Sequence, residues 1–283
     1  MEFILVTVEL AVFVVTVIHL QRESKKRKQD SFRTKPYQPK FWVNILTLIL
    51  ISGIILTLIM NSNPRIFQLA WANKTIIGNG ILLTLEVSLL AIIFGSVIGT
   101  ILALIITYPK RRAFLSLIDS TLYAFIYILL GIPALVFLFY FYYGPTKHFS
   151  IFWISVIALS INLIPFVAKI IIASIRNISK DQIEAAISFG YTPWQRFWYF
   201  QVLFVLKDSG QSLLVEYYTT IKLSSLAGLF ALAEVYHATL NIVANTYDTV
   251  NAYIILAFCY VLIVTWIAVL ADYMERKWKP MIN

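Results

Sequence analysis

Among the ionisable side chains inside the long apolar stretches of this 283-residue chain, four are its strongest candidates for chemistry: Lys169, Glu216, Lys222 and Glu234. An ionisable side chain at the centre of a bilayer costs about 2.5–3.5 kcal/mol on insertion scales, so it usually faces a bundle interior or a water-filled path. The alternatives are structural ion pairs among these residues, or lysines that extend their ammonium groups to the membrane surface.

Other reactive groups are scarce. Ser224 and Ser225 could donate hydrogen bonds to a carboxylate, although hydroxyls in spans more often bond to their own backbone. The three histidines are scattered without metal-ligand spacing, and Cys259 is the one cysteine, which excludes a disulfide framework and a cysteine-based zinc or iron–sulfur site. We therefore expect no metal, no bound cofactor and no enzymatic activity in this chain.

Composition places these residues in a membrane. Hydrophobic residues make up 60% of the chain and charged residues 13%, whereas soluble domains are about half apolar and a quarter charged. The mean hydropathy is +0.80. We expect an all-α integral membrane protein, because helices of about 20 apolar residues span a bilayer.

The sequence predicts seven transmembrane helices, at 3–20, 41–60, 81–107, 114–143, 151–175, 198–243 and 251–273. The segment 198–243 is too long for one straight crossing and contains most of the charges considered above. We expect it to cross, break and partly re-enter, which is tolerated only where the backbone is buried in protein or lines a cavity.

Lysine and arginine set the orientation. Residues 21–40 contain eight of the 23, and the turn near 110, the loop near 185 and the C-terminal tail contain three each. Only three lie on the opposite side. Since cytoplasmic loops carry the excess of Lys and Arg, we expect an outside N-terminus and a cytoplasmic C-terminus in a plasma membrane. The basic residues are then topogenic flanks beside the lipid bilayer, and nucleic acid is not an expected partner.

Residues 176–203 form the most distinctive segment on the basic side. Ser179 and Gln182 have the spacing of a capping box, and so do Thr192 and Gln195. Gly190 lies between them, where a glycine in the left-handed conformation can end a helix. The pattern predicts a short helix, a glycine turn and a second helix that leads back into the membrane.

The first of these helices is too short and too polar to span. It carries Glu184 beside two small residues, Ala185 and Ala186, where a partner could pack closely. From the residues alone, two functions stay open: a docking element for another protein, or a connector that covers the inner face of the bundle.

This segment resembles the "EAA" loop of ABC-importer permeases, and the wider chain resembles their polar amino-acid branch over roughly residues 78–278. Several blocks fall in the family's order. They are Gly80 to Leu85 with Gly95 and Gly99; Gly131-Ile132-Pro133; Gln182, Glu184, Ala185, Ala186, Gly190, Gln195 and Phe197; Lys222 to Leu226; and Glu234.

The resemblance implies a permease subunit of an ATP-driven importer for an amino acid or a similar small polar solute. Five core helices within 78–283 would form the permease domain, with the coupling helix near 179–197. A second permease chain would pair with it as a homo- or heterodimer. A cytoplasmic ATPase would dock on Gln182, Glu184, Ala185, Ala186, Gly190 and Phe197, and an extracellular binding protein would deliver the solute. The host would be prokaryotic.

The resemblance also places the nucleotide chemistry elsewhere. This chain has no Gly-x-x-x-x-Gly-Lys-Ser/Thr loop for phosphate, so ATP and Mg would bind in the partner ATPase. Residues 1–77, with two helices and a basic linker, lie outside the resemblance and form an N-terminal extension.

A zwitterionic solute needs a cation for its carboxylate and an anion for its ammonium group. We expect the substrate path to involve eight residues: Gly131, Pro133, Lys169, Glu216, Lys222, Ser224, Ser225 and Glu234.

The chain departs from the family where the family carries charge. Leu130 replaces an arginine, Lys169 a glutamate and Ile172 a second arginine. These changes keep a diverged, non-transporting scaffold subunit open as an alternative. A secondary transporter is the other alternative, although such proteins usually show paired broken helices in both halves.

Overall fold

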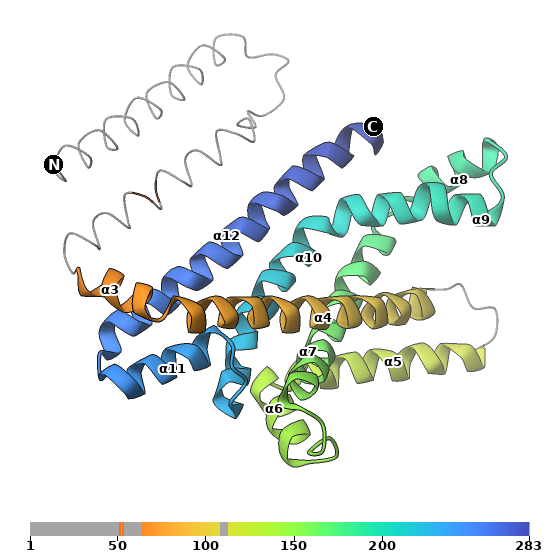
Figure 1. The fold of residues 1–283 in the computed structure, drawn as a ribbon. Helices are drawn as coiled ribbons and strands as arrows, with labels where there is room; N and C mark the ends of the chain where they lie inside the picture. The colour runs from red at the N-terminus through yellow and green to blue at the C-terminus, as the bar shows by residue number, and fades with distance from the viewer. Residues whose placement is uncertain (1–50, 52, 54–63, 108–112, 283) are drawn as a thin grey trace, which may run out of the picture.

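The computed structural model describes residues 51, 53, 64–107 and 113–282, and all its regular elements are helical (Figure 1). This confirms the all-α prediction for the described part of the chain. The elements are α3 (Arg65–Ala72), α4 (Lys74–Thr107), α5 (Ala113–Gly131), α6 (Ala134–Tyr143), α7 (Ile151–Arg176), α8 (Lys180–Ser188), α9 (Pro193–Arg196), the π-helix η1 (Phe197–Val202), α10 (Leu203–Leu223), the 3-10 helix η2 (Ser224–Phe230), α11 (Val235–Thr246) and α12 (Thr249–Ile282).

Three described helices, α4, α7 and α12, are long and apolar enough to cross a membrane, and two bent helix pairs raise the number of spans to five. These five correspond to the predicted core spans. The predicted spans 3–20 and 41–60 lie outside the described residues, apart from Ile51 and Gly53. The structure therefore supports five of the seven predicted crossings.

The predicted span 114–143 is present, but its helix is broken. The segment contains two helices, α5 and α6, whose axes differ by 92°. The break falls at Gly131-Ile132-Pro133, because proline lacks a backbone N–H and its ring disfavours helical geometry at the preceding residue. Pro133 takes an extended conformation and precedes the first turn of α6.

The predicted break inside 198–243 is confirmed. The helical segment Pro193–Phe230 and α11 form a bent pair at 45°. Between them, Ala231 has a φ of 64°, in the left-handed region that ends helices. Two broken spans are thus present in the described part of the chain, where the sequence predicted one.

α7 is the central helix, and α4 packs along it. The contact face of α4 is built from small residues, among them Ala91, Gly95, Gly99 and Ala103. A Cβ atom added to Gly99 would lie 2.8 Å from the carbonyl oxygen of Ile164, so these backbones are too close for a larger residue. The two glycines therefore serve close helix packing within the chain.

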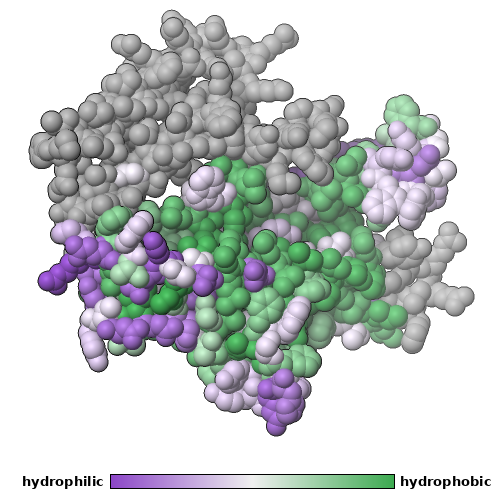
Figure 2. Space-filling model, viewed as in Figure 1, coloured by the Kyte–Doolittle hydropathy of each residue, from purple (hydrophilic) through white to green (hydrophobic). Residues whose placement is uncertain are grey.

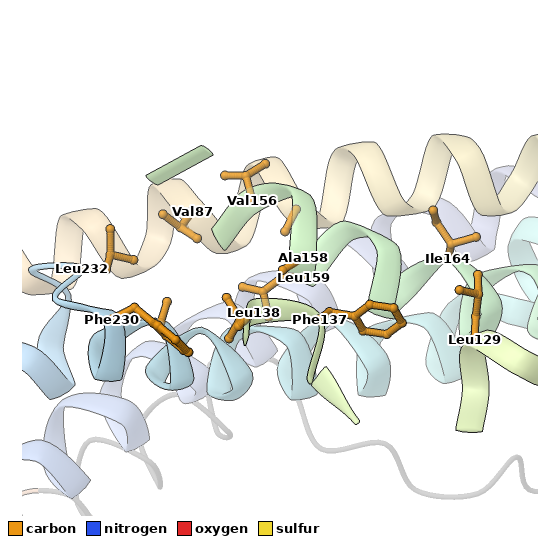
Figure 3. Packing of buried hydrophobic residues seen from close by; sticks show 12 residues of the cluster. Val87, Leu129, Phe137, Leu138, Val156, Ala158, Leu159, Ile164, Phe230 and Leu232 are labelled. Atoms are coloured by element: carbon orange, nitrogen blue, oxygen red, sulfur yellow. The ribbon is translucent and has the colours of Figure 1, made fainter. Parts of the chain in front are cut away.

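The largest apolar cluster joins α4, α5, α6, α7 and η2 (Figure 3). Val87, Leu138 and Leu159 are almost completely buried in it. Phe230 extends from η2 toward α6, so that one core holds parts of both broken spans together.

The surface has the polarity of a membrane protein. In Figure 2, apolar residues cover the middle of the molecule over α4, and hydrophilic residues gather toward α3 and α11 and at the bottom of the view, below α6. Large apolar side chains such as Leu82, Ile93 and Ile101 are more than half exposed on α4. Such exposed apolar area fits contact with lipid or with other membrane helices.

Candidate functional site

The hairpin α8–α9 is built by the two capping boxes that its sequence predicts. At α8, the backbone N–H of Gln182 donates to Oγ of Ser179 at 3.3 Å, and the N–H of Ser179 donates to Oε1 of Gln182 at 3.3 Å. At α9, Thr192 and Gln195 form the same reciprocal pair at 2.9 and 3.3 Å. Both helix starts are therefore fixed by local residues.

Gly190 ends α8 as predicted, with a φ of +79°. Its N–H donates to the carbonyl of Ile187 at 2.8 Å, and the N–H of Tyr191 donates to the carbonyl of Ala186 at 3.2 Å. These are the two bonds of a Schellman motif, in which a left-handed residue satisfies the last helix carbonyls. The hairpin stands at one end of the bundle (Figure 1).

α8 presents nearly all of its surface outward. Gln182, Glu184 and Ala185 are exposed, whereas Ala186 is buried. Phe189, directly after the helix, is 82% exposed. The outer surface of α8, with this exposed phenyl ring, is therefore not covered by any described residue of the chain.

The second helix of the hairpin carries a row of aromatic rings. Phe197 stacks on Trp194 with ring centroids 6.3 Å apart and meets Trp198 edge-on at 5.3 Å. Phe197 is half-buried, so it supports the hairpin from within while Trp194 is exposed. The π-helix η1 starts at Phe197.

The residues predicted for a substrate path fall at the two helix breaks and on two intact helices. Gly131 and Pro133 lie exposed at the bend between α5 and α6. Lys222 is exposed at the end of α10, and Glu216 is half-buried two turns earlier. Lys169 is exposed on α7, with its ammonium nitrogen 5.3 Å from the ring centroid of Tyr127.

The two broken spans meet through aromatic contacts between η2 and α6. Phe230 of η2 packs edge-on against Phe139 of α6 with centroids 4.9 Å apart, and against Tyr142 at 5.0 Å. The hydroxyls of Ser224 and Ser225 donate to the carbonyls of Ile221 and Lys222, both at 2.7 Å. These serines therefore bond to their own helix, as is common for hydroxyls in spans.

Glu234 lies completely buried at the start of α11. Its Oε1 accepts the N–H of His237 at 2.9 Å, and its Oε2 accepts the N–H of Tyr236 at 2.8 Å. The hydroxyl of Tyr260 on α12 donates to Oε2 at 3.0 Å, and that of Thr84 on α4 at 3.4 Å. One carboxylate thus caps α11 and connects three helices.

The surroundings of Glu234 are tightly closed. A Cβ atom at Gly228 would overlap Oε1 of Glu234, and one at Gly80 would lie 3.0 Å from the backbone of Val235. Thr84 also accepts the N–H of Val235 at 3.3 Å. In this structure, Glu234 therefore holds the chain together and does not line an open space.

Sequence reasoning missed the partners of Glu234. Thr84 belongs to one of the blocks that resemble the permease family, but that block gave it no role. Nothing in the sequence singled out Tyr260 as a partner of Glu234, because a tyrosine in an apolar helix is common in membrane proteins. The residues that the structure describes include no group of three or more His, Cys, Asp or Glu side chains placed to hold a metal ion.

The chain matches the family of binding-protein-dependent transport system inner membrane components over residues 95–202. A Rickettsia bellii protein, named as the permease GlnP of a glutamine transport system, is 30% identical over 202 residues, which are 70% of this chain and 90% of that protein. The arginine transport system permease protein ArtQ of Bacillus subtilis is 28% identical over 204 residues, covering 71% of this chain and 91% of ArtQ.

The fold agrees with the sequence comparison. A chain in the crystal structure of an amino acid ABC transporter with histidines superposes with a TM-score of 0.64 at 26% identity, and covers 72% of this chain and 94% of that one. The chain belongs to the family of binding-protein-dependent transport system inner membrane components, the non-enzymatic permease subunits of ABC transporters.

Proposed function

We propose that this protein is the membrane-spanning subunit of an importer that moves an amino acid into the cytoplasm, and that α8 receives the force of ATP hydrolysis from a partner ATPase. The observation that carries the proposal is the capped hairpin α8–α9, a rigid and exposed element at one end of a bundle. The relatives named for glutamine and arginine transport support an amino acid as the solute.

α8 is suited to a docking role because its fold does not depend on a partner. Its two ends are closed by the capping box and by Gly190, and one buried residue, Ala186, faces the chain itself. Glu184, Ala185 and Phe189 remain outward for a groove on the ATPase. ATP and Mg would bind in that partner.

The orientation follows from the basic flanks. With the hairpin in the cytoplasm, α4 runs inward, α10 runs outward and the C-terminus is cytoplasmic. Cys259 is the one native cysteine and it is buried, so a new cysteine at the exposed Ser188 reports sidedness. We expect Ser188→Cys to react with a membrane-impermeant maleimide only after the cells are opened. Reaction in intact cells would reverse the orientation.

We place the solute path along the broken spans. Lys222 and Glu216 on α10 offer a cation for a carboxylate and an anion for an ammonium group, and the bend at Gly131 and Pro133 offers irregular backbone. Polar residues continue on the exposed side of α10 at Ser212 and Thr219. Glu234, which caps α11 and bonds to α12, stabilises the helices next to this path.

One observation favours a second candidate, a subunit that supports the complex without binding the solute. Leu130 and Ile172, which stand where the family has arginines, lie in one apolar cluster with Ile126 and Leu163. At this cluster the chain therefore lacks two cations that the family carries. Stimulation of ATPase activity by an amino acid and its binding protein would separate the two candidates.

The docking test compares co-purification of a cytoplasmic ATPase with the tagged full-length chain in mild detergent. Glu184→Arg and Ala185→Trp change exposed side chains of α8, whereas Lys147→Glu changes an exposed residue in the connection between α6 and α7. We expect the ATPase to accompany the wild type and Lys147→Glu and to be lost from both α8 variants. Retention in the α8 variants, or no ATPase with folded wild type, would overturn the proposal.

A further inference from the structure

Two cations on α7 each lie over a tyrosine of α5. The ammonium nitrogen of Lys169 is 5.3 Å from the ring centroid of Tyr127. The guanidinium carbon of Arg176 is 5.5 Å from the ring centroid of Tyr123, and its Nη2 donates to the Tyr123 hydroxyl. Both distances fall within the range of cation–π attraction, about 6 Å. We call these four residues the cation–tyrosine ladder.

The ladder arises from helix periodicity. Lys169 and Arg176 are seven residues apart and therefore share one face of α7, and Tyr123 and Tyr127 are one turn apart on α5. The two helices run in opposite directions along each other, so the outer tyrosine meets Lys169 and the inner one meets Arg176. The rings hold both cations in place on one side of the bundle.

In the described ranges, no ion pair joins Lys169 or Arg176 to an acidic side chain, and both residues are exposed. Exposed cations fixed on rings that carry no net charge can still bind an anionic group. The ladder is therefore a preformed site for a phosphate or a carboxylate.

The surroundings favour a lipid over a polar solute. Toward the middle of the membrane from Tyr123, the exposed side chains of α5 include the apolar Phe125 (47% exposed) and Ile128 (62%), whereas the exposed Ser120 and Thr121, nearer the cytoplasmic end, are polar. A path for a hydrophilic solute needs polar walls, such as those that α10 offers. Apolar walls below a pair of cations fit acyl chains below a headgroup.

The two cations also lie at the depth in the membrane that a lipid headgroup occupies. Arg176 ends α7 on the side that we assign to the cytoplasm, and Lys169 lies about 10 Å further into the membrane at 1.5 Å per residue. A lysine can extend from there to the interface. In the sequence, Lys110, Arg111 and Arg112 come directly before α5. Anionic lipids of the cytoplasmic leaflet attract such clusters.

We propose that the cation–tyrosine ladder binds the phosphate of an anionic phospholipid from the inner leaflet, with its acyl chains along the exposed face of α5. The proposal rests on the orientation given under "Proposed function", and on no other part of that function. Nothing in it requires the ATPase, the binding protein or the solute.

The test is native mass spectrometry of the full-length chain titrated with phosphatidylglycerol or with phosphatidylcholine of equal chain length. The test variant is Lys169→Gln with Arg176→Gln, and the matched control is Lys147→Gln, an exposed lysine in the connection between α6 and α7. At about 1 kcal/mol per basic residue, each cation accounts for roughly fivefold in affinity. We expect the double variant to bind phosphatidylglycerol about 25-fold more weakly, and the control to bind like the wild type.

A second pair of variants tests the rings. Tyr127→Phe keeps the ring over Lys169 and should leave lipid affinity within about twofold, whereas Tyr127→Leu should weaken it, because the ring contributes the cation–π attraction. Equal affinity of the wild type and the folded double variant for phosphatidylglycerol would overturn the proposal. So would equal affinity of the wild type for the two lipids.

Other results have separate meanings. If the double variant loses amino-acid uptake but keeps its phosphatidylglycerol affinity, the ladder serves the solute and the lipid proposal is wrong. If lipid binding behaves as expected but no ATPase co-purifies with the chain, the docking proposal fails and the lipid site stands. Maleimide labelling of Ser188→Cys checks the orientation independently of both.

Discussion

The hairpin α8–α9 and the junction around Glu234 are both held by capping hydrogen bonds, but they are specified in opposite ways. Each cap of the hairpin joins residues three positions apart and is exposed. The junction joins Glu234 to a residue 150 positions away and is closed to solvent. A local, exposed element can contact a partner without cost to the fold, whereas the junction positions three helices and tolerates little change.

Glu234→Ala should have the largest effect on stability. It would leave the N–H groups of Tyr236 and His237 and the hydroxyl of Tyr260 buried without their acceptor. Since each orphaned donor costs about 1–3 kcal/mol, we expect a loss on the order of 3 kcal/mol. Thermal unfolding in detergent measures it. An unchanged midpoint would show that the junction does not hold the fold.

Gly228→Ala should come next. Its methyl group would overlap the carboxylate of Glu234, and overpacking of this kind typically costs about 1–3 kcal/mol. Gly210→Ala on α10 is the matched control, because a Cβ there meets nothing within 4 Å. We expect the first substitution to lower the unfolding midpoint and the second to leave it unchanged or raise it. If both behave alike, the junction is looser than its geometry indicates.

Tyr260→Phe should have a smaller effect at the same site. It removes one hydrogen bond of 3.0 Å to Oε2 and leaves the backbone cap of α11 intact. A hydrogen bond to a charged group contributes about 1.5–3 kcal/mol, and we expect the lower end because Thr84 can still donate. The same thermal unfolding assay should place this variant between the wild type and Glu234→Ala. A loss of stability as large as that of Glu234→Ala would mean that the Tyr260 hydrogen bond, and not the cap of α11, accounts for the stability of the junction.

Ser179→Ala should change global stability least. It removes the side-chain cap of α8, which contributes about 1 kcal/mol, but only to an exposed local helix. We expect faster amide hydrogen exchange in α8 and an unchanged unfolding midpoint. Ser188→Ala, at the other end of the same helix, is the control. A lowered midpoint for Ser179→Ala would mean that the hairpin is part of the core.

The same contrast explains what the sequence could predict. Ser179, Gln182, Gly190 and Thr192 act on neighbours along the chain, so their spacing revealed both helix starts and the turn. The bend at Pro133 was also local, but the uninterrupted apolar run around it outweighed one proline. The partners of Glu234 and the pairing of Lys169 with Tyr127 depend on which helices lie side by side. No spacing within one segment encodes that.

The family resemblance supplied part of what local patterns lacked. It grouped Thr84 and Glu234 in one set of residues, although it gave neither residue a contact. The departures at Leu130 and Ile172 gained a physical meaning only when the structure placed both in one apolar cluster. Long-range contacts therefore came from the fold, and the function came from the residues and the family together.

The most direct test of the central claim, that α8 couples ATP hydrolysis to transport, is uptake into proteoliposomes. The purified complex and its binding protein would be supplied with enclosed ATP and labelled glutamine or arginine. We predict ATP-dependent uptake in wild type, a fall of about tenfold in Glu184→Arg, equivalent to 1.4 kcal/mol, and near wild-type uptake in Lys147→Glu. Uptake that needs no ATP, or that Glu184→Arg leaves unchanged in an intact complex, would contradict the account.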